Sequence, residues 1–239
     1  SGDGQSPESP APSATVALDG VAADADITLL YGAGTFEEGL AIGGSGRVVT
    51  LVGLCPSETH LSGGDQIAVQ VDDVARLRVA GLHLSSEVER SPDSFREGAL
   101  AVFGAGGIEL SELMIESTYT LGITIYDVGA RGVHLSSTSF GRTNINSFAV
   151  VGSAGPVTIA GSDFRGPNWG WIVNILDIAG DVTMTHNYVG ASASRGVTVS
   201  SIDGDLRFSN NEVAGPLGEL GLYVNAEEHQ EGAVNIEHN

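Results

Sequence analysis

Two adjacent aspartates, Asp72 and Asp73, are candidates for acid–base chemistry in this 239-residue chain. A pair of carboxylates can divide the roles of general acid and general base, provided that each is positioned against a partner group. A lone Asp-Asp pair at the end of a strand is also a common solvated turn. The sequence therefore leaves two interpretations of this pair open, a weak catalytic candidate and a surface turn.

The six histidines do not predict a metal centre. A zinc site needs three or four ligands that converge on one point. His83 and His134 fall at different positions of the repeat described below, and His186 and His238 share a position but lie two repeats apart. We interpret these residues as turn or surface histidines and expect no metal ligands.

Aromatic and polar side chains between the apolar segments form a candidate ligand-binding set. Aromatic rings suit sugars because they combine apolar area with a polar edge. Tyr119, Tyr126 and Trp169 could stack on sugar rings. Arg165 and Asn168 could hydrogen-bond sugar hydroxyl groups. The competing interpretation is that Trp169 seals its own loop onto the chain beneath it, because partly buried tryptophan is common.

These residues lie within a repeat of roughly two dozen residues that covers most of the chain. The first apolar segments of successive units start 31, 23, 26, 23, 25 and 25 residues apart. A period in this range is typical of stacked structural units. The first segments are Ala68-Val69, Ala99-Leu100, Gly122-Ile123, Phe148-Ala149, Trp171-Ile172, Gly196-Val197 and Gly221-Leu222.

Two further apolar segments follow within each unit. The second segment alternates with period two, which places its named residues inside and their neighbours outside. A third apolar position comes seven residues after the start of the second segment. The second segments are Leu77-x-Val79, Ile108-x-Leu110, Val133-x-Leu135, Val157-x-Ile159, Val182-x-Met184, Leu206-x-Phe208 and Val234-x-Ile236, and the third positions are Leu84, Ile115, Phe140, Phe164, Val189 and Val213.

The three recurring columns predict short parallel strands that stack coil upon coil, about 4.8 Å apart. Frequent turns agree with this, because the chain holds 34 glycines and places Asp, Asn and Ser clusters between the apolar segments. No segment has a long helical period. A β-sandwich, in which strands recur about every 8–12 residues, is the alternative fold. It does not explain why the columns recur every three strands.

Two motifs add a family resemblance to the repeat. Gly34-Thr-Phe-Glu-Glu38 is a Gly-Thr-aromatic-x-Glu turn before an apolar segment, and Asn187, Asn211 and Asn239 share one position of the repeat. With these motifs, residues 26 to 239 or so resemble the pectin-lyase-like superfamily, whose members often stack asparagines at an inward turn. The resemblance implies an all-β fold, a right-handed parallel β-helix of about eight to nine coils with three short strands each.

The resemblance does not extend to a recognisable catalytic set. Lyase-like members of the superfamily use several carboxylates for calcium, and a calcium ion takes six or more oxygen ligands. Among the expected outward positions of the first segments only Asp72 is a carboxylate. We therefore expect no cofactor, and calcium is the candidate if the protein binds one. The outward positions are Gln70, Ala101, Thr124, Val150, Asn174, Thr198 and Tyr223, with Asp72, Phe103, Tyr126, Ser200 and Asn225 beside them.

Polygalacturonase-like members use several aspartates near His and basic motifs. Asp72-Asp73 resembles their paired aspartates. The supporting Asn-Thr-Asp, Gly-His-Gly and Arg-Ile-Lys motifs are absent from the sequence. The family resemblance is therefore specific for fold and weak for activity.

The chain is strongly acidic, with 30 Asp and Glu residues against 10 arginines and no lysine, a formal net charge of −20. Nucleic acids and anionic lipids need a basic footprint, so we expect neither as a partner. A polyanionic substrate is disfavoured unless a cation bridges it. The single cysteine, Cys55, excludes an internal disulfide, and no apolar run is long enough to span a membrane.

The ends of the chain suggest its context. Residues 1–14 read as a flexible Pro/Ser-rich tether and residues 15–239 as one β-helix domain. A tether before a solenoid fits a mature exported protein, secreted or at the surface of a bacterium, although a chain cut here for another reason would look the same. The sequence stops at Asn239, before the next expected apolar position, so we expect a truncated solenoid or a partner that covers its end.

Two functions follow as hypotheses. The first is a non-catalytic secreted or cell-surface module that binds a polysaccharide or another surface protein, because the scaffold carries no recognisable catalytic set. The alternative is a polysaccharide lyase or glycoside hydrolase whose site is unrecognised or lies in missing coils. The long connection 85–98 motivates the alternative, because long loops on rigid scaffolds often carry function.

Overall fold

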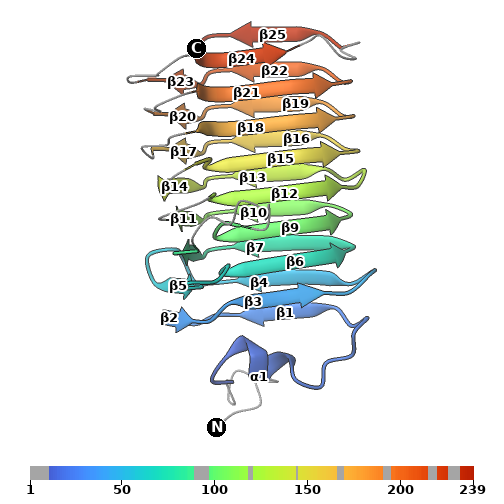
Figure 1. Ribbon diagram of the computed structural model, residues 1–239, viewed down its shortest axis with the longest axis vertical. Helices are drawn as coiled ribbons and strands as arrows, with labels where there is room; N and C mark the ends of the chain where they lie inside the picture. Colours follow the sequence, from blue (N-terminus) through green and yellow to red (C-terminus); the bar gives the residue numbers. More distant parts are fainter. Residues whose placement is uncertain are drawn as a thin grey trace.

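The computed structural model describes residues 11–88, 97–117, 121–143, 145–165, 170–190, 195–214, 220–225 and 232–239. Over these residues the chain forms a parallel β-solenoid of three sheets, with one short helix at its N-terminal end (Figure 1). Neighbours within each sheet are three strands apart in chain order, so they come from successive coils. This arrangement confirms the expected all-β fold with three short strands per coil.

Each sheet collects one strand from each coil, and we name the sheets after the sequence segments that form them. The first-strand sheet contains β3 (Leu40–Gly43), β6 (Val69–Val74), β9 (Leu100–Ala105), β12 (Ile123–Val128), β15 (Phe148–Ser153), β18 (Trp171–Ile178), β21 (Arg195–Ile202) and β24 (Leu220–Asn225). The second-strand sheet contains β1 (Ile27–Leu30), β4 (Val48–Val52), β7 (Arg76–Ala80), β10 (Ile108–Ser111), β13 (Val133–Ser136), β16 (Val157–Ala160), β19 (Val182–Thr185), β22 (Leu206–Ser209) and β25 (Val234–Glu237). The third-strand sheet contains β2 (Gly34–Glu37), β5 (Thr59–Ser62), β8 (His83–Ser86), β11 (Met114–Ser117), β14 (Ser139–Thr143), β17 (Asp163–Phe164), β20 (Tyr188–Val189) and β23 (Glu212–Val213).

The number of coils is slightly lower than the eight to nine expected. The solenoid makes about 7 turns. Eight strands stacked in a sheet of the described residues are separated by seven steps, and each step is one turn of the chain. The difference therefore concerns the ends of the stack and leaves its architecture unchanged.

The register of the second-strand and third-strand sheets confirms the sequence columns. Leu77 pairs with Ile108, which pairs with Val133, and the series continues to Leu206 and Val234. The third column pairs in the same way from Leu84 to Val213, and it extends two coils earlier, through Leu61 to Phe36. Like residues therefore stack on like residues, as the period predicted.

The register of the first-strand sheet corrects the sequence alignment at two coils. Phe148 pairs with Ile123 on one side and with Val173 on the other, so the column continues through Val173 and not through Ile172. The outward row consequently passes through Ala149, and Val150 is a fully buried core residue. The sequence alignment was wrong here because continuous apolar runs such as 148–151 and 171–173 show no alternation that would fix their phase.

The interior is a column of apolar side chains that runs the length of the solenoid. The inward residues of the third-strand sheet are fully buried from Leu61 to Val189. Phe140 and Phe164 stack face to face there, with ring centroids 4.6 Å apart and an interplanar angle of 13°. Burial of such rings stabilises the fold, because an aromatic side chain removes a large apolar area from water.

Short corners join the second and third strands of each coil. In the corners that follow β7, β10, β13, β16, β19, β22 and β25, one residue adopts positive φ, as His186 does at 58° and His238 at 53°. These two histidines are therefore turn residues, as expected. The next residue points inward, and Asn187, Asn211 and Asn239 form the predicted amide ladder, in which Oδ1 of each following asparagine accepts the backbone N–H of the one before.

The N-terminal end of the solenoid is covered by residues 11–26, which include helix α1 (Ala14–Leu18). Ala14 is buried, and its backbone N–H donates to both carboxylate oxygens of Glu38 at 3.0 Å. The buried guanidinium of Arg47 donates to the carbonyl oxygens of Gly43 and Ala22. At the opposite end, β25 pairs with β22, and its residues are exposed.

Candidate functional site

The outward face of the first-strand sheet holds two rows of side chains in register. The row at the middle of the strands is Gln70, Ala101, Thr124, Ala149, Asn174, Thr198 and Tyr223. The row two residues further along is Asp72, Phe103, Tyr126, Val151, Leu176, Ser200 and Asn225. Asp72 is the single carboxylate in these two rows, whereas a calcium ion takes six or more oxygen ligands.

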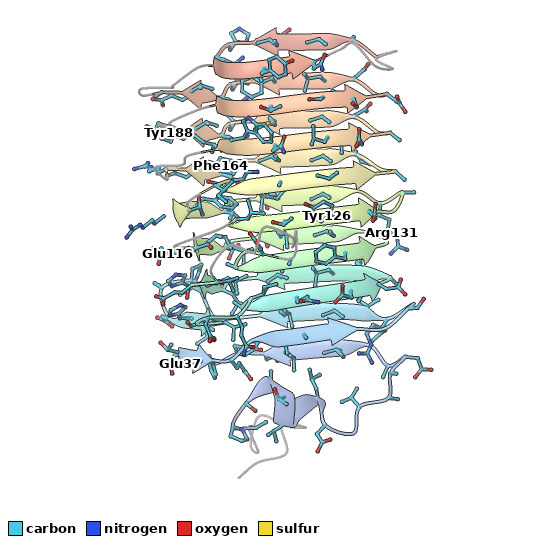
Figure 2. All side chains as sticks on the ribbon, viewed as in Figure 1. Glu37, Glu116, Tyr126, Arg131, Phe164 and Tyr188 are labelled. Carbon is cyan, nitrogen blue, oxygen red and sulfur yellow. The ribbon has the colours of Figure 1, made fainter. Side chains whose placement is uncertain are left out.

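Phe103 and Tyr126 form an aromatic pair on this face. Their rings stack with centroids 5.4 Å apart and an interplanar angle of 3°. Both side chains are half-buried, and Tyr126 lies in the centre of the sheet that faces the reader in Figure 2. Burial raises the pKa of the Tyr126 phenol above its ordinary value, and the nearby Glu97 carboxylate adds to the increase. The phenol therefore keeps its proton and remains a hydrogen-bond donor at neutral pH.

Polar side chains of the middle row are buried although they point outward. The Thr124 hydroxyl donates to the backbone oxygen of Glu97 at 3.3 Å. Asn174 and Thr198 pair in register on β18 and β21 and are 5% and 3% exposed. Asn174 Oδ1 and Thr198 Oγ1 have no hydrogen-bond partner among the described residues. Such buried polar atoms are unusual, because leaving one unsatisfied costs about 1–3 kcal/mol.

The two aspartates of the sequence analysis occupy different environments. Asp72 Oδ2 accepts a hydrogen bond from the Gln70 side chain at 2.6 Å. Asp73 is exposed at a turn position with φ of 51°, a conformation that Asp tolerates better than most residues. Asp127 and Asp177 have the same turn conformation two and four coils later. Asp73 thus belongs to a repeated turn, whereas Asp72 lies beside the aromatic pair.

Arg165, the one other predicted ligand-binding residue within the described part of the chain, does not lie beside Tyr126. Arg165 follows β17 on the third-strand sheet, where Nε lies 2.7 Å from an Asp163 carboxylate oxygen and the guanidinium lies 5.1 Å from the Tyr188 ring centroid. Tyr188 and Tyr126 lie on different sheets, as Figure 2 shows. Three further predicted residues, Tyr119, Asn168 and Trp169, lie outside the described residues.

A cluster that the sequence analysis missed lies on the outward face of the third-strand sheet. His60 on β5 and His83 on β8 pair in register, and their imidazole rings stack with centroids 4.0 Å apart and an interplanar angle of 11°. His60 Nε2 lies 2.7 Å from Ser85 Oγ. His83 Nε2 lies 3.3 Å from Glu116 Oε2 on β11. We call these four residues the histidine stack.

The histidine stack holds a serine and an imidazole in contact, which is the first requirement of a nucleophile and its base. Ser85 and Glu116 are direct neighbours in register, however. A carboxylate at that position opposes the negative charge that an oxyanion would develop. Among the described residues, no group of three or more His, Cys, Asp or Glu side chains is arranged to hold a metal ion. The geometry of the stack therefore favours proton binding over nucleophilic or metal chemistry.

The signal for this cluster was present in the sequence. His60 precedes Leu61 and His83 precedes Leu84, and these two leucines share the third column. The sequence analysis started the third column at Leu84. The later members follow the start of a second segment by seven residues, and no second segment starts seven residues before Leu61. Extending the column by one coil would have placed the two histidines side by side.

Comparisons with protein-family models, with curated proteins and with solved structures found no match. In the part of the chain that the structure describes, no helix is long and apolar enough to cross a membrane.

Proposed function

We propose that this protein is a non-catalytic module of a secreted or cell-surface bacterial protein that binds a polysaccharide on the outward face of its first-strand sheet. The Phe103–Tyr126 pair is the observation that carries the proposal. The resemblance of the repeat and of the Gly34–Glu38 motif to the pectin-lyase-like superfamily supports a carbohydrate ligand.

The aromatic pair supports sugar binding through its chemistry. Two stacked rings on successive coils form a rigid apolar pair, since the strands that carry them are hydrogen-bonded neighbours. The Tyr126 phenol and the Gln70–Asp72 pair place hydrogen-bonding groups near the stacked rings. Apolar faces and hydroxyl groups of a pyranose ring need both kinds of contact.

Charge supports a neutral glycan as the ligand. The protein carries a formal charge of −20, and Asp72 adds a carboxylate to the proposed face. A polyuronate would be repelled unless cations bridged the two surfaces. We therefore expect binding of neutral chains to be independent of calcium.

The test measures binding and cleavage on the same polysaccharide panel. Affinity electrophoresis with neutral and acidic glycans, with and without calcium, should reveal retention that Phe103→Ala and Tyr126→Ala weaken at least about tenfold. Tyr188→Ala is the matched control, because Tyr188 is a half-buried aromatic residue on the third-strand sheet. Retention by no glycan, or equal loss in the control, would contradict the proposal.

A reducing-end release assay on the same panel separates binding from catalysis. We expect no release above the blank. Release that is lost in Asp72→Asn would support the alternative, a polysaccharide lyase or glycoside hydrolase, and would make Asp72 and Asp73 the first residues to examine.

A further inference from the structure

The histidine stack lies outside the proposed glycan-binding face. It is carried by β5, β8 and β11 of the third-strand sheet, which appears at the left of Figure 1, where Figure 2 labels Glu116. The rings of His60 and His83 are in van der Waals contact at a centroid distance of 4.0 Å. Direct stacking of two ionisable rings calls for an explanation, because two positive charges at this separation repel each other strongly.

The rigid sheet fixes the distance between the two imidazoles. His60 and His83 are register partners on adjacent parallel strands, and the following residues Leu61 and Leu84 are fully buried in the core. The strand spacing fixes the separation of the two backbones, and so of the two Cβ atoms, while β5 and β8 remain paired. A second proton on the stack must therefore be tolerated at contact distance or relieved by rotating a ring away or by opening the strand pair.

The charged groups around the stack are asymmetric. Glu116 on β11 faces His83, whereas the hydrogen-bonding neighbour of His60 is the uncharged hydroxyl of Ser85. On the other side of β5, the β2 carboxylate of Glu37 is the register partner of Ser62 and lies one row away from His60. Arg142 lies on strand β14, which follows β11 in the sheet, and its side chain is exposed.

Burial lowers the pKa of His60 below its ordinary value, and the positive charge of His83 lowers it further. Glu116 opposes this effect in part. The direction agrees with the geometry, since His60 is the member of the stack that lacks a facing carboxylate.

We infer that the His60–His83 stack is a proton-sensitive joint in the solenoid, in which the two stacked rings resist carrying a positive charge at the same time. When acid forces the second proton onto His60, repulsion between the imidazolium rings weakens the pairing of β5 with β8. The joint thereby links the stability of the early coils to pH in the range where histidine titrates.

The sign of the effect follows from linkage. A histidine whose pKa is lowered by folding binds fewer protons in the native state than in the unfolded state. Its contribution to stability is complete above the ordinary histidine pKa of about 6.5 and is lost as the pH falls through the lowered native value. Acidification therefore weakens the joint, and neutral pH restores it.

Nuclear magnetic resonance of histidine-labelled protein tests the coupling directly. The His60 resonance, assigned with His60→Gln, should titrate below the ordinary value, and His83→Gln should move its midpoint upward. The control is His134→Gln, since His134 is an exposed histidine of β13 on the second-strand sheet. A His60 midpoint that stays unchanged in His83→Gln would overturn the inference.

Hydrogen exchange gives a second measurement that does not depend on assignment of the rings. After correction for the intrinsic exchange rate, amides of β5 and β8 should open several-fold more readily at about pH 5 than at about pH 7 in the parent protein. His83→Gln should reduce that increase, because the charge of His83 is removed while the burial of His60 remains, and amides of β16 and β19 serve as internal references. The same acid-induced increase in His83→Gln would contradict a joint formed by the two rings.

Discussion

Asn187 donates two hydrogen bonds to one atom of Asn211: its backbone N–H and its side-chain amide both reach Asn211 Oδ1, at 3.0 and 2.9 Å. Asn211 repeats the backbone contact with Asn239 at 2.9 Å. Below this ladder, Ser162 donates its backbone N–H to Asn187 Oδ1. The inward corner therefore holds a continuous polar seam beside an apolar core.

Replacing Asn211 by alanine should destabilise the protein by about 2–4 kcal/mol, because the buried Asn187 N–H and the Met184 carbonyl would lose their partner. Urea denaturation followed by circular dichroism measures the change. The control is Asn235→Ala, an exposed asparagine on β25. Equal effects of the two substitutions would rule out a structural contribution from the ladder.

Gly132 should tolerate no side chain. Its φ is 69°, and a Cβ atom there would overlap the carbonyl oxygen of Pro156 in the next coil. Gly161 has a similar φ of 56°, but a Cβ atom added to Gly161 would lie in open space. We expect Gly161→Ala to cost about 1 kcal/mol from backbone strain alone, and Gly132→Ala to cost at least about 3 kcal/mol. A thermal melt of both variants separates the steric term from the conformational one, and similar costs would argue against the clash.

The stacked rings of Phe140 and Phe164 should contribute strongly to stability. Phe164 is fully buried, so Phe164→Ala should lower the free energy of unfolding by about 3–5 kcal/mol, and Phe164→Leu by less. Arg165→Ala, at the neighbouring exposed position, should leave the free energy of unfolding nearly unchanged because water screens its pair with Asp163. Chemical denaturation of the three variants gives the comparison, and a large effect of Arg165→Ala would contradict our account of that ion pair.

The Tyr126 phenol should ionise later than a free tyrosine on alkaline titration, because burial and Glu97 raise its pKa. The native state then keeps a proton that the unfolded state releases, so this stabilising contribution is complete below about pH 10 and is lost as the pH rises further. Absorbance near about 295 nm, compared between the parent protein and Tyr126→Phe, isolates the late component. In urea the component that Tyr126→Phe removes should titrate at the ordinary tyrosine pKa, and a late component that persists there would exclude folding as the cause.

The sequence predicted the stacking of the coils because the apolar residues that stack on one another recur at equivalent positions of the repeat. Alternating segments such as Ile108-x-Leu110 revealed which side chains face inward, and the asparagine column followed from constant spacing within a coil. The continuous apolar runs at Phe148 and Ile172 misled the alignment by one residue, since residues that are all apolar carry no phase. Hydrogen bonding between coils fixed that phase.

The sequence by itself determined the period, the three columns, the inward asparagines and the acidic charge of the molecule, because these are properties of residue order and composition. Only the tertiary structure decided which outward side chains meet. Phe103 meets Tyr126, and His60 meets His83, across 23 residues in each case, while Arg165 and Tyr126 are held on different sheets. Contacts between outward residues depend on register between coils of unequal length, and that register is set by cooperative backbone pairing along the whole stack.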